Sequence, residues 1–518
     1  MSYKNLTAEQ KIGRVLCARL VKGSDADLEF TLKLLREGAC ACVQLRVDKD
    51  APEIIKKLRA AADYPILVIN DMETGFQLSD RAAVPQLSLA ACNNPEVTRT
   101  FAATVASDAK AAGFSGCWGP VVDILHNDGP CSVYRRAGDT PEGVLKLTEE
   151  IARVFDSYRF HSTAKHYPGC DHPIDTHMAE GTSPLTKEEL LSFDLIPYLE
   201  LMKKGLLRSI MSMHTVYPNI DPDYPASLSK KVIDIIRDEG FDGVIYTDSL
   251  AMMGILQKYG EAEAMAIALM AGNDIILPNY RTSTEAVYEM MLDCYNRGLI
   301  TDERLDEACR RIDELCEYCA ETPENPYPIP ENANEILESV PKMSITAKCE
   351  EGKSYAINPD EPHLFVVVTD NAAAQVSEEI YELKWYSPYR VKEAILERFP
   401  KSEVVFIPEF ASAQDNDRVL RSAIPYNSVV FVTYCDTTSY LGTDCLTRRC
   451  EMLIKCMNIS GKCKSLVHFG NPLAITAIEG MDRKIFGYRA ARAQVYAFDV
   501  LSGKLEPMGS NPFPRHCD

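Results

Sequence analysis

The sequence has few basic residues and no long apolar run. Its 518 residues include 55 Lys and Arg against 75 Asp and Glu, for a formal net charge of -20. Nucleic acids and anionic membrane surfaces bind clustered basic side chains, so we expect no nucleic-acid partner and no membrane partner. No run of 18 apolar residues occurs, and the N-terminal MSYKNLTAEQ lacks the apolar core of a signal peptide. We therefore expect a cytoplasmic protein.

The sequence also lacks the short motifs that hold common cofactors. Neither GxGxxG nor GxxxxGK[ST] occurs, so the glycines that cradle the phosphates of a nucleotide are missing. The 18 cysteines are scattered without the two paired CxxC spacings of a zinc ribbon, and we interpret them as free thiols in a reducing compartment. We expect no cofactor and no metal.

Short β-rich runs alternate with longer helical patterns over residues 1–320. This alternation is typical of βα units around a parallel sheet. The runs lie at 14–20, 41–47, 65–71, 116–123, 160–166, 207–214, 243–248 and 274–278. They predict an α/β fold with a (β/α)8 TIM-like barrel, in which reactive groups lie where strands end and loops begin.

Five of these runs end in an ionisable residue. They are Asp71, Asp123, His166, His214 and Asp248. Any one of them could be a hydrogen-bonded structural group, but five at the same end of a parallel sheet indicate a functional site. The sequence therefore predicts that this rim carries the chemistry.

The segment KHYPGCDHPIDTH, residues 165–177, combines three histidines, a lysine and two aspartates. The next helix is predicted to begin at Thr186, because TKEE offers a capping box with Glu189. The long stretch between strand and helix has no regular pattern. In a compact domain such a stretch favours a functional loop.

A second domain is predicted after a linker. Residues 321–340 contain four prolines and few large apolar side chains, and we place the linker at 321–360. Four buried-type runs follow, at 363–370, 402–408, 428–434 and 463–470. Separated by helix-length spacers, they predict an open parallel α/β sheet in a C-terminal domain at 361–518.

Several blocks of the sequence resemble one known family. AKHYPGCDHPIDTH, IMSMHTVYP, PASLS and GVIYTDSLAM are similar, in this order, to motifs of glycoside hydrolase family 3, most of all to its β-N-acetylglucosaminidases. GNPLAITAIEGMDRKIFGYRA and LSGKLEP resemble the family's C-terminal α/β sandwich domain. The resemblance thus extends over most of the chain.

The resemblance implies roles for particular residues. Asp248 would be the catalytic nucleophile, and Asp175 with His177 would form the acid/base pair. The substrate-binding residues would be Asp71, Arg135, Lys165, His166 and His214.

The sequence departs from the family pattern at four places. GCD at 169–171 stands where the family has GHG, and ETG at 73–75 stands for EGG. Ser79 occupies a position where arginine is frequent, and TDSL around Asp248 replaces SDDL. The nucleophile and the acid/base pair are kept, so these departures concern recognition of the sugar.

The resemblance implies a retaining, exo-acting β-N-acetylglucosaminidase that hydrolyses terminal N-acetylhexosaminides through a covalent glycosyl-aspartate intermediate. An aspartate carboxylate can attack the anomeric carbon, and an imidazole can donate a proton and later accept one near neutral pH. The substrate would be a small carbohydrate, as in cell-wall recycling. The oligomeric state is not indicated.

Other hypotheses remain open. The same family contains β-glucosidase and xylosidase types and phosphorolytic relatives, which transfer the sugar to phosphate. A metal-dependent barrel hydrolase would use His166, His172, His177, His214 and Asp248 as ligands. A non-catalytic sugar-binding relative is a further alternative, although such a protein would be expected to lose the nucleophile or the acid/base pair.

Overall fold

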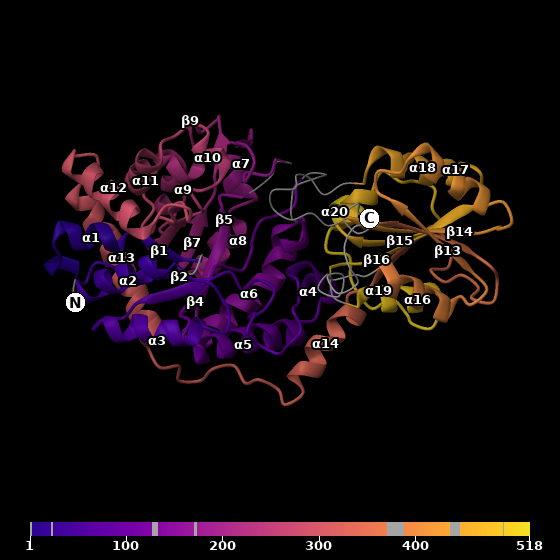
Figure 1. The fold of residues 1–518 in the computed structure, drawn as a ribbon, viewed down its shortest axis with the longest axis horizontal. Coiled ribbons are helices and arrows are strands. Elements are labelled where there is room, and N and C mark those ends of the chain that lie inside the picture. The colour runs from indigo at the N-terminus through magenta and orange to yellow at the C-terminus, as the bar shows by residue number, and fades with distance from the viewer. Residues whose placement is uncertain are drawn as a thin grey trace. The chain divides into compact units, whose positions relative to one another are not determined.

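The computed structural model describes residues 3–21, 24–126, 133–169, 174–369, 388–435, 446–489 and 492–517 (Figure 1). The chain forms two compact units. The first contains residues 1–81, 98–126 and 141–333, and the second contains 82–97, 127–140 and 334–518. Among the described residues, no helix combines the length and the apolarity that a membrane crossing requires.

The first unit is built on a curled, entirely parallel sheet. Its order is β1-β2-β3-β4-β5-β7-β10, so neighbouring strands follow one another along the chain. The strands are β1 Cys17–Leu20, β2 Cys42–Leu45, β3 Leu67–Asn70, β4 Gly116–Cys117, β5 His161–Tyr167, β7 Ser209–Ser212 and β10 Val244–Thr247. Each lies inside a predicted run except β5, which extends one residue beyond its run to Tyr167. The sequential order brings all the carboxyl ends to one rim.

Two of the predicted strands are shorter than expected. β4 stops at Cys117 because Pro120 follows and has no N–H to donate, and a single bridge between Val121 and Lys165 continues the pairing. The run at 274–278 forms no regular strand. It pairs through isolated parallel bridges, Ile276 with Leu16 and Ile275 with Tyr246. The regular sheet therefore has seven strands.

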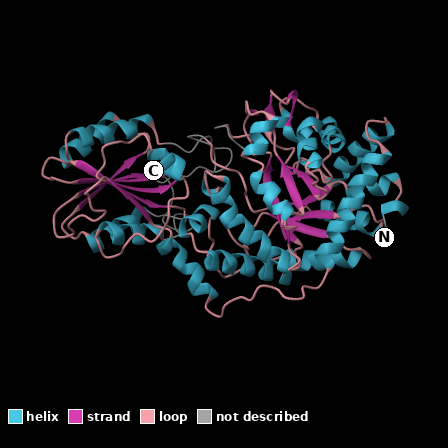
Figure 2. Cartoon of the chain, turned by 180° about the vertical axis from the view of Figure 1, so that it is seen from behind, coloured by secondary structure: helices cyan, strands magenta, loops and turns pink. Residues whose placement is uncertain are grey.

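Helices lie around these strands (Figure 2). α6 shows the reason: Val144, Leu147, Ile151 and Phe155 recur at helical spacing, and all four are buried. The helices of this part of the chain are α1 Ala8–Arg14, α2 Asp25–Arg36, α3 Ala51–Ala61, α5 Pro95–Ala111, α6 Pro141–Ser157, α7 Lys187–Ser192, α8 Ile196–Lys203, α9 Lys230–Asp238, α10 Met253–Leu256, α11 Glu261–Ala271, α12 Thr284–Asn296 and α13 Asp302–Ala320, with short 3-10 turns at Tyr3–Asn5 and Ala226–Leu228.

The predicted capping box is confirmed. The Thr186 hydroxyl accepts a hydrogen bond from the Glu189 amide, and the Glu189 carboxylate accepts one from the Thr186 amide, so α7 begins at Lys187. The stretch before it contributes one short strand, β6 Gly181–Thr182, to a three-stranded sheet. Its partners are β8 Thr215–Tyr217 and β9 Asp221–Pro225.

The second unit contains a six-stranded sheet of order β11-β16-β15-β14-β12-β13. The strands are β11 Thr346–Cys349, β12 Leu364–Thr369, β13 Glu403–Pro408, β14 Val429–Cys435, β15 Cys463–Gly470 and β16 Arg483–Gly487. All pairs are parallel except that of β11 with β16 at one edge. The unit's helices are α4 Gln86–Cys92, α14 Ala333–Met343, α16 Pro388–Arg398, α17 Ala413–Ser422, α18 Arg448–Ile459, α19 Ala493–Leu501 and α20 Pro514–Cys517, with 3-10 turns at Val133–Arg135 and Pro472–Ile475.

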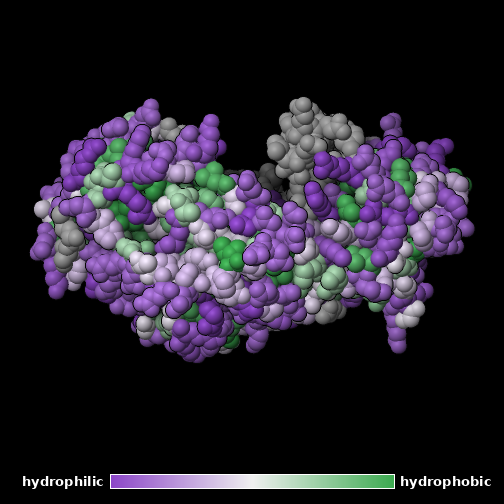
Figure 3. Space-filling view, turned by 90° about the horizontal axis from the view of Figure 1, so that it is seen from below, coloured by the Kyte–Doolittle hydropathy of each residue, from purple (hydrophilic) through white to green (hydrophobic). Residues whose placement is uncertain are grey.

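The segment 321–360, expected as a linker, contains regular structure in its second half. α14 buries Ala333, Leu337 and Val340, and β11 forms the edge of the C-terminal sheet. These apolar residues recur at helical spacing, which a count of prolines alone does not register. The molecular face in Figure 3 is mainly hydrophilic with small apolar patches, in line with the high content of charged residues.

Candidate active site

Asp248 lies directly after β10, at the rim of the curled sheet. Its backbone amide donates to the Ser212 carbonyl at 2.7 Å, and its Oδ1 accepts a bond from the Ser249 amide at 2.6 Å. Among the described residues, no side chain forms a salt bridge or a hydrogen bond with Oδ2. One carboxylate oxygen is thus held in place while the other remains available for chemistry.

The charge state of Asp248 depends on three histidines. Burial opposes ionisation of the carboxyl, but Coulomb interactions with the nearby His166, His214 and His177 outweigh it and lower the pKa of Asp248 to about 2. The Ser249 amide bond acts in the same direction. Asp248 is therefore a carboxylate near neutral pH.

His214 holds the backbone next to Asp248. The ring is buried, its Nδ1 lies 2.8 Å from Ser227 Oγ, and its Nε2 lies 3.0 Å from the Ser249 carbonyl oxygen. The carbonyl can only accept, so Nε2 carries the proton and Nδ1 accepts from the serine hydroxyl. Burial lowers the pKa of His214, which keeps the ring neutral. Both nitrogens are therefore engaged by protein groups.

Asp175 and His177 form a hydrogen-bonded pair on the long loop. Asp175 Oδ1 lies 2.8 Å from His177 Nδ1 and also accepts a bond from the His177 amide at 3.0 Å. The Asp175 side chain is 1% exposed and that of His177 is 26% exposed. The carboxylate fixes the orientation of the ring.

The backbone of this loop is attached to the segment that follows Asp248. The Met253 amide donates to the His177 carbonyl and the Gly254 amide donates to the Thr176 carbonyl, both at 3.2 Å. A Cβ at Gly254 would lie 3.2 Å from that same Thr176 oxygen, so glycine permits the close approach. The loop that carries Asp175 and His177 is thereby joined to the segment after Asp248 through α10.

Lys165 lies between two carboxylates that follow β3. Its Nζ is 2.6 Å from Asp71 Oδ1 and 2.5 Å from Glu73 Oε1. The lysine side chain is 2% exposed, whereas that of Asp71 is 55% exposed. The ammonium therefore orients Asp71 at the surface of the site. Glu73 was not singled out from the sequence, although it is the first residue of the ETG motif at 73–75.

His166 is paired with Asp123, the residue that ends the fourth predicted run. Asp123 Oδ2 lies 2.8 Å from His166 Nδ1, and Asp123 Oδ1 accepts a bond from the His166 amide at 2.8 Å. All five predicted strand-end residues therefore take part in the polar contacts of this rim. Asp123 therefore orients the His166 side chain and backbone.

The sequence singled out further positions. Arg135 ends the 3-10 turn Val133–Arg135 in the second unit. Ser79 donates to Asp108 Oδ2 at 2.7 Å, and Arg81 binds the same oxygen at 3.1 Å, so neither supplies the guanidinium that the family often has after β3. Cys170, Asp171 and His172 lie outside the described residues.

Arg19 on β1 is a component of the rim that sequence reasoning missed. Its guanidinium donates to Gln44 on β2, to the Ser249 hydroxyl and to the Pro278 carbonyl. Gln44 in turn donates to Asn70 at the end of β3 at 3.2 Å. The available signal was an arginine inside the apolar run 14–20, which itself begins with Arg14.

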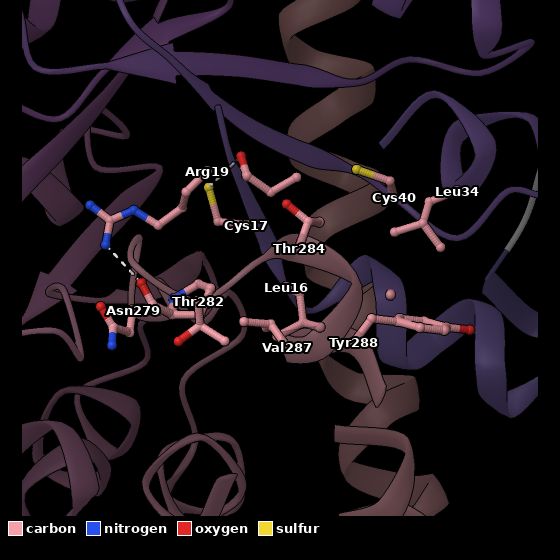
Figure 4. A pocket seen from close by; sticks show the side chains of 13 residues that line it. Leu16, Cys17, Arg19, Leu34, Cys40, Asn279, Thr282, Thr284, Val287 and Tyr288 are labelled. Carbon is pink, nitrogen blue, oxygen red and sulfur yellow. Dashed lines mark hydrogen bonds between the residues drawn. The ribbon is translucent and has the colours of Figure 1, made fainter. Parts of the chain in front are cut away.

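The close-up in Figure 4 shows a small cavity beside Arg19. It is lined by residues of β1 and α12, with a volume near 20 Å³. A space of this size holds about one water molecule and no sugar ring.

Within the described residues, no group of three or more His, Cys, Asp or Glu side chains has the geometry of a metal site. The metal-dependent alternative named four histidines and Asp248 as ligands. His214 has both nitrogens bound, and the Nδ1 atoms of His166 and His177 face carboxylates. His172 lies outside the described residues.

Comparisons with known proteins agree on one family. The model described as "Glycosyl hydrolase family 3 N terminal domain" matches residues 34–315, more than half of the chain. A protein named beta-hexosaminidase from Idiomarina loihiensis is 32% identical over 285 residues, which cover 52% of this chain and 80% of that protein.

Solved structures share the fold. A glycoside hydrolase family 3 beta-N-acetylglucosaminidase from Paenibacillus sp. str. FPU-7 aligns with a TM-score of 0.78 and 24% identity, covering 99% of this chain and 100% of that chain. A beta-glucoside phosphorylase, BglX, aligns with a TM-score of 0.79 and 20% identity, covering 98% and 94%. At these identities the likeness is one of fold.

Proposed function

Because this chain belongs to glycosyl hydrolase family 3, we propose that it is a retaining, exo-acting β-N-acetylglucosaminidase. The observation that carries the proposal is the pairing of two features: a carboxylate with one unengaged oxygen, and a carboxylate-oriented histidine attached to the same loop. The hexosaminidase name of the relative supports the choice of sugar.

Asp248 is the nucleophile in this proposal. Its Oδ2 attacks the anomeric carbon and forms a glycosyl ester, while the bond from the sugar to the leaving oxygen breaks. Oδ1 stays on the Ser249 amide at 2.6 Å, which keeps the carboxylate plane in position. The low pKa of Asp248 means that the attacking oxygen is ionised before substrate binds.

His177 is the general acid and then the general base. In the first step it protonates the leaving oxygen, and in the second it takes a proton from the water that attacks the ester. Asp175 holds Nδ1, so the same nitrogen, Nε2, serves both steps. The carboxylate also stabilises the imidazolium form that the first step requires.

Asp71, Lys165 and His166 bind the sugar. Asp71 is the most exposed of the three and accepts from ring hydroxyls, while the buried Lys165 fixes its orientation. His166 is held by Asp123 and lies close enough to affect the charge of Asp248. His214 orients the nucleophile's backbone. Arg135 is included as a sugar contact on the strength of the resemblance alone.

We also infer that the curled sheet closes as a (β/α)8-like barrel, followed by an α/β sandwich domain. The Cys17 amide donates to the Ile276 carbonyl, and the Thr247 amide donates to the Ile275 carbonyl. The segment at 275–276 therefore contacts both edge strands. Closure gathers the carboxyl ends of the strands around one opening.

Phosphorolysis is the second candidate. A histidine acid/base repels an incoming phosphate less than a carboxylate would, and one solved structure of like fold is a beta-glucoside phosphorylase. Hydrolysis is preferred because the relative named in the sequence comparison is a hexosaminidase.

A panel of nitrophenyl glycosides tests the proposal. The N-acetylglucosaminide, glucoside and xyloside are assayed with and without phosphate, and with and without a chelator. We expect the N-acetylglucosaminide to be the preferred substrate, with free sugar as product and no effect of the chelator. A sugar 1-phosphate as product would replace hydrolysis by phosphorolysis, and a rate restored only by zinc would favour a metal-dependent enzyme.

A further inference from the structure

Arg19 joins three separate parts of the first unit through one guanidinium. Nε donates to Gln44 Oε1 at 2.6 Å, and Nη1 donates to Ser249 Oγ at 2.6 Å and to the Pro278 carbonyl at 2.7 Å. The Tyr280 ring lies 5.1 Å from the guanidinium carbon. Figure 4 shows the side chain extended toward Asn279, with the bond to the neighbouring carbonyl drawn.

Ser249 is the residue through which these contacts reach Asp248. Its hydroxyl accepts from Arg19, its carbonyl accepts from His214, and its amide donates to the Asp248 carboxylate. The hydroxyl also lies 3.4 Å from the Ala251 amide. Every polar group of this one residue is thus bound, and any displacement of Ser249 moves the donor that holds Asp248 Oδ1.

We propose that Arg19 is a positioning residue for the nucleophile, acting through the Ser249 hydroxyl. The proposal rests on the function proposed for Asp248. Arg19 does not contact the sugar in this role. It fixes the loop after β10 against β1, β2 and the 278–280 segment, so that Oδ2 keeps its direction while the carboxylate becomes an ester.

The planar guanidinium is suited to this task. Its fixed fork makes three hydrogen bonds in directions that a single ammonium group cannot reproduce. It also brings a permanent positive charge near Asp248, alongside the imidazoles of His166, His177 and His214. When the carboxylate loses its charge in the ester, the hydrogen bonds from Arg19 to the neutral oxygens of Ser249 and Pro278 remain.

Arg208 provides an internal control with similar contacts at the opposite end of the strands. It precedes β7, binds Asp156 at 3.1 Å, and lies over the Tyr318 ring at 4.0 Å. Like Arg19 it is partly buried and packs on a tyrosine. Loss of Arg208 therefore reproduces the loss of an arginine from this unit without touching the loop after β10.

The test compares Arg19→Met, Arg19→Lys, Ser249→Ala and Arg208→Met in the full chain. For Arg19→Met we expect kcat to fall by about 10²-fold with KM little changed, since small misplacements of a reacting group cost this much. Removal of the cation raises the pKa of Asp248, so the acid limb of kcat/KM moves to higher pH. Arg208→Met should change neither quantity in the folded protein.

The other variants separate geometry from charge. Arg19→Lys keeps the cation, so the acid limb should stay in place while kcat falls. Ser249→Ala should lower kcat by about tenfold, and Arg19→Met added to Ser249→Ala should cost much less than it costs in the wild type. Fully additive losses, or a change in KM alone, would overturn the proposal. If Arg19→Met does not fold, the Ser249→Ala and Arg19→Lys results decide it.

Labelling distinguishes this proposal from the one it rests on. A mechanism-based 5-fluoro glycosyl fluoride should attach to Asp248 in the wild type, as detected by peptide mass spectrometry. Labelling of a different residue would remove the proposed nucleophile. Labelling of Asp248 at the same rate in the wild type and in Arg19→Met would reject the role of Arg19 and leave the nucleophile intact.

Discussion

An aspartate lies at each end of the parallel strands in the first unit. The two aspartates differ in the groups that bind their carboxylate oxygens. Asp248, after β10, has one oxygen on a backbone amide and no salt bridge with any described residue. Asp274, at the opposite end, is bound by Arg304 at 2.5 Å, Arg237 at 2.7 Å and Arg311 at 3.2 Å.

Both carboxyls have a lowered pKa, and different side chains lower it. For each, burial raises the pKa and Coulomb interactions outweigh it, with three arginines at Asp274 and three histidines at Asp248. The Asp274 oxygens are saturated by direct bonds, whereas Asp248 feels its histidines without being bonded to them. A buried, ionised aspartate is therefore not sufficient evidence of a reactive group, and the decisive feature is an oxygen without a partner.

Substitution of Asp248 tests the reactive side of this comparison and carries the largest expected effect. Asp248→Asn should lose roughly 10⁴-fold or more in kcat, because an amide cannot form the glycosyl ester. The unfolding transition should be nearly unchanged, since no salt bridge is broken. Steady-state kinetics and circular dichroism measure the two. Activity close to wild type would end the nucleophile assignment.

Substitution of His177 sharpens the comparison by asking whether the residue near Asp248 transfers protons. His177→Ala should cost about 10² to 10⁴ in the first step for substrates with a poor leaving group. A nitrophenyl leaving group departs without a proton, so the rate of that step should fall far less for a nitrophenyl substrate. Single-turnover measurements with both leaving groups provide the check, and equal losses would mean that the loop only shapes the pocket.

Substitution of Asp274 tests the structural side. Asp274→Asn leaves three arginines without their buried counter-charge and should reduce the free energy of unfolding by about 3 to 5 kcal/mol. Turnover per folded molecule should stay near wild type. Denaturant unfolding and active-site titration separate the two quantities. A loss of turnover without a loss of stability would contradict the division between the two ends of the strands.

The same substitution has a predicted pH dependence. Because the folded-state pKa of Asp274 is lowered, its contribution to stability is complete above the pKa of an unfolded carboxyl and is lost as the pH falls toward the folded value. The difference in stability between wild type and Asp274→Asn should therefore shrink in acid. A difference that grows as the pH falls would show the opposite linkage.

The smallest expected effect concerns the histidines around Asp248. His166→Gln removes the largest of the charges that lower the pKa of Asp248 from its usual range to about 2. In the proposed mechanism the carboxylate of Asp248 must be ionised, so the acid limb of kcat/KM should move to higher pH. Loss of the proposed sugar contact should in addition lower the rate. An unmoved limb would mean that His166 does not influence the nucleophile.

Much of the fold could be predicted from the sequence because local patterns determine it. Six of the seven regular strands of the curled sheet lie within a predicted run, and β5 exceeds its run by one residue. Thr186 with Glu189 forms the predicted capping box. Lengths were harder to predict. Pro120 shortens β4, and the run at 274–278 forms only bridges, since both depend on which neighbours supply hydrogen bonds.

The structure brings several residues named from the sequence to one rim, whereas most of their contacts could not be predicted. Asp175 and His177 are two residues apart, and their hydrogen bond follows from that spacing. Lys165 and Asp71 are far apart in sequence, as are Arg19 and Ser249, which lie 230 positions from one another. Such pairs arise only when the sheet brings strand ends together, so Arg19 and Glu73 were not identified beforehand.

The sequence by itself determined the alternation of strands and helices, the rim on which polar residues end the strands, and the family resemblance of the 165–177 loop. The tertiary structure decided which aspartate is open to chemistry. Asp248 ends an apolar run and Asp274 begins one, and the sequence alone does not show which groups bind either carboxylate. They differ because arginines from α9 and α13 reach Asp274, whereas Asp248 keeps one oxygen unbound among the described residues. The partners of a carboxylate come from distant segments, and their approach is set by packing and not by local sequence.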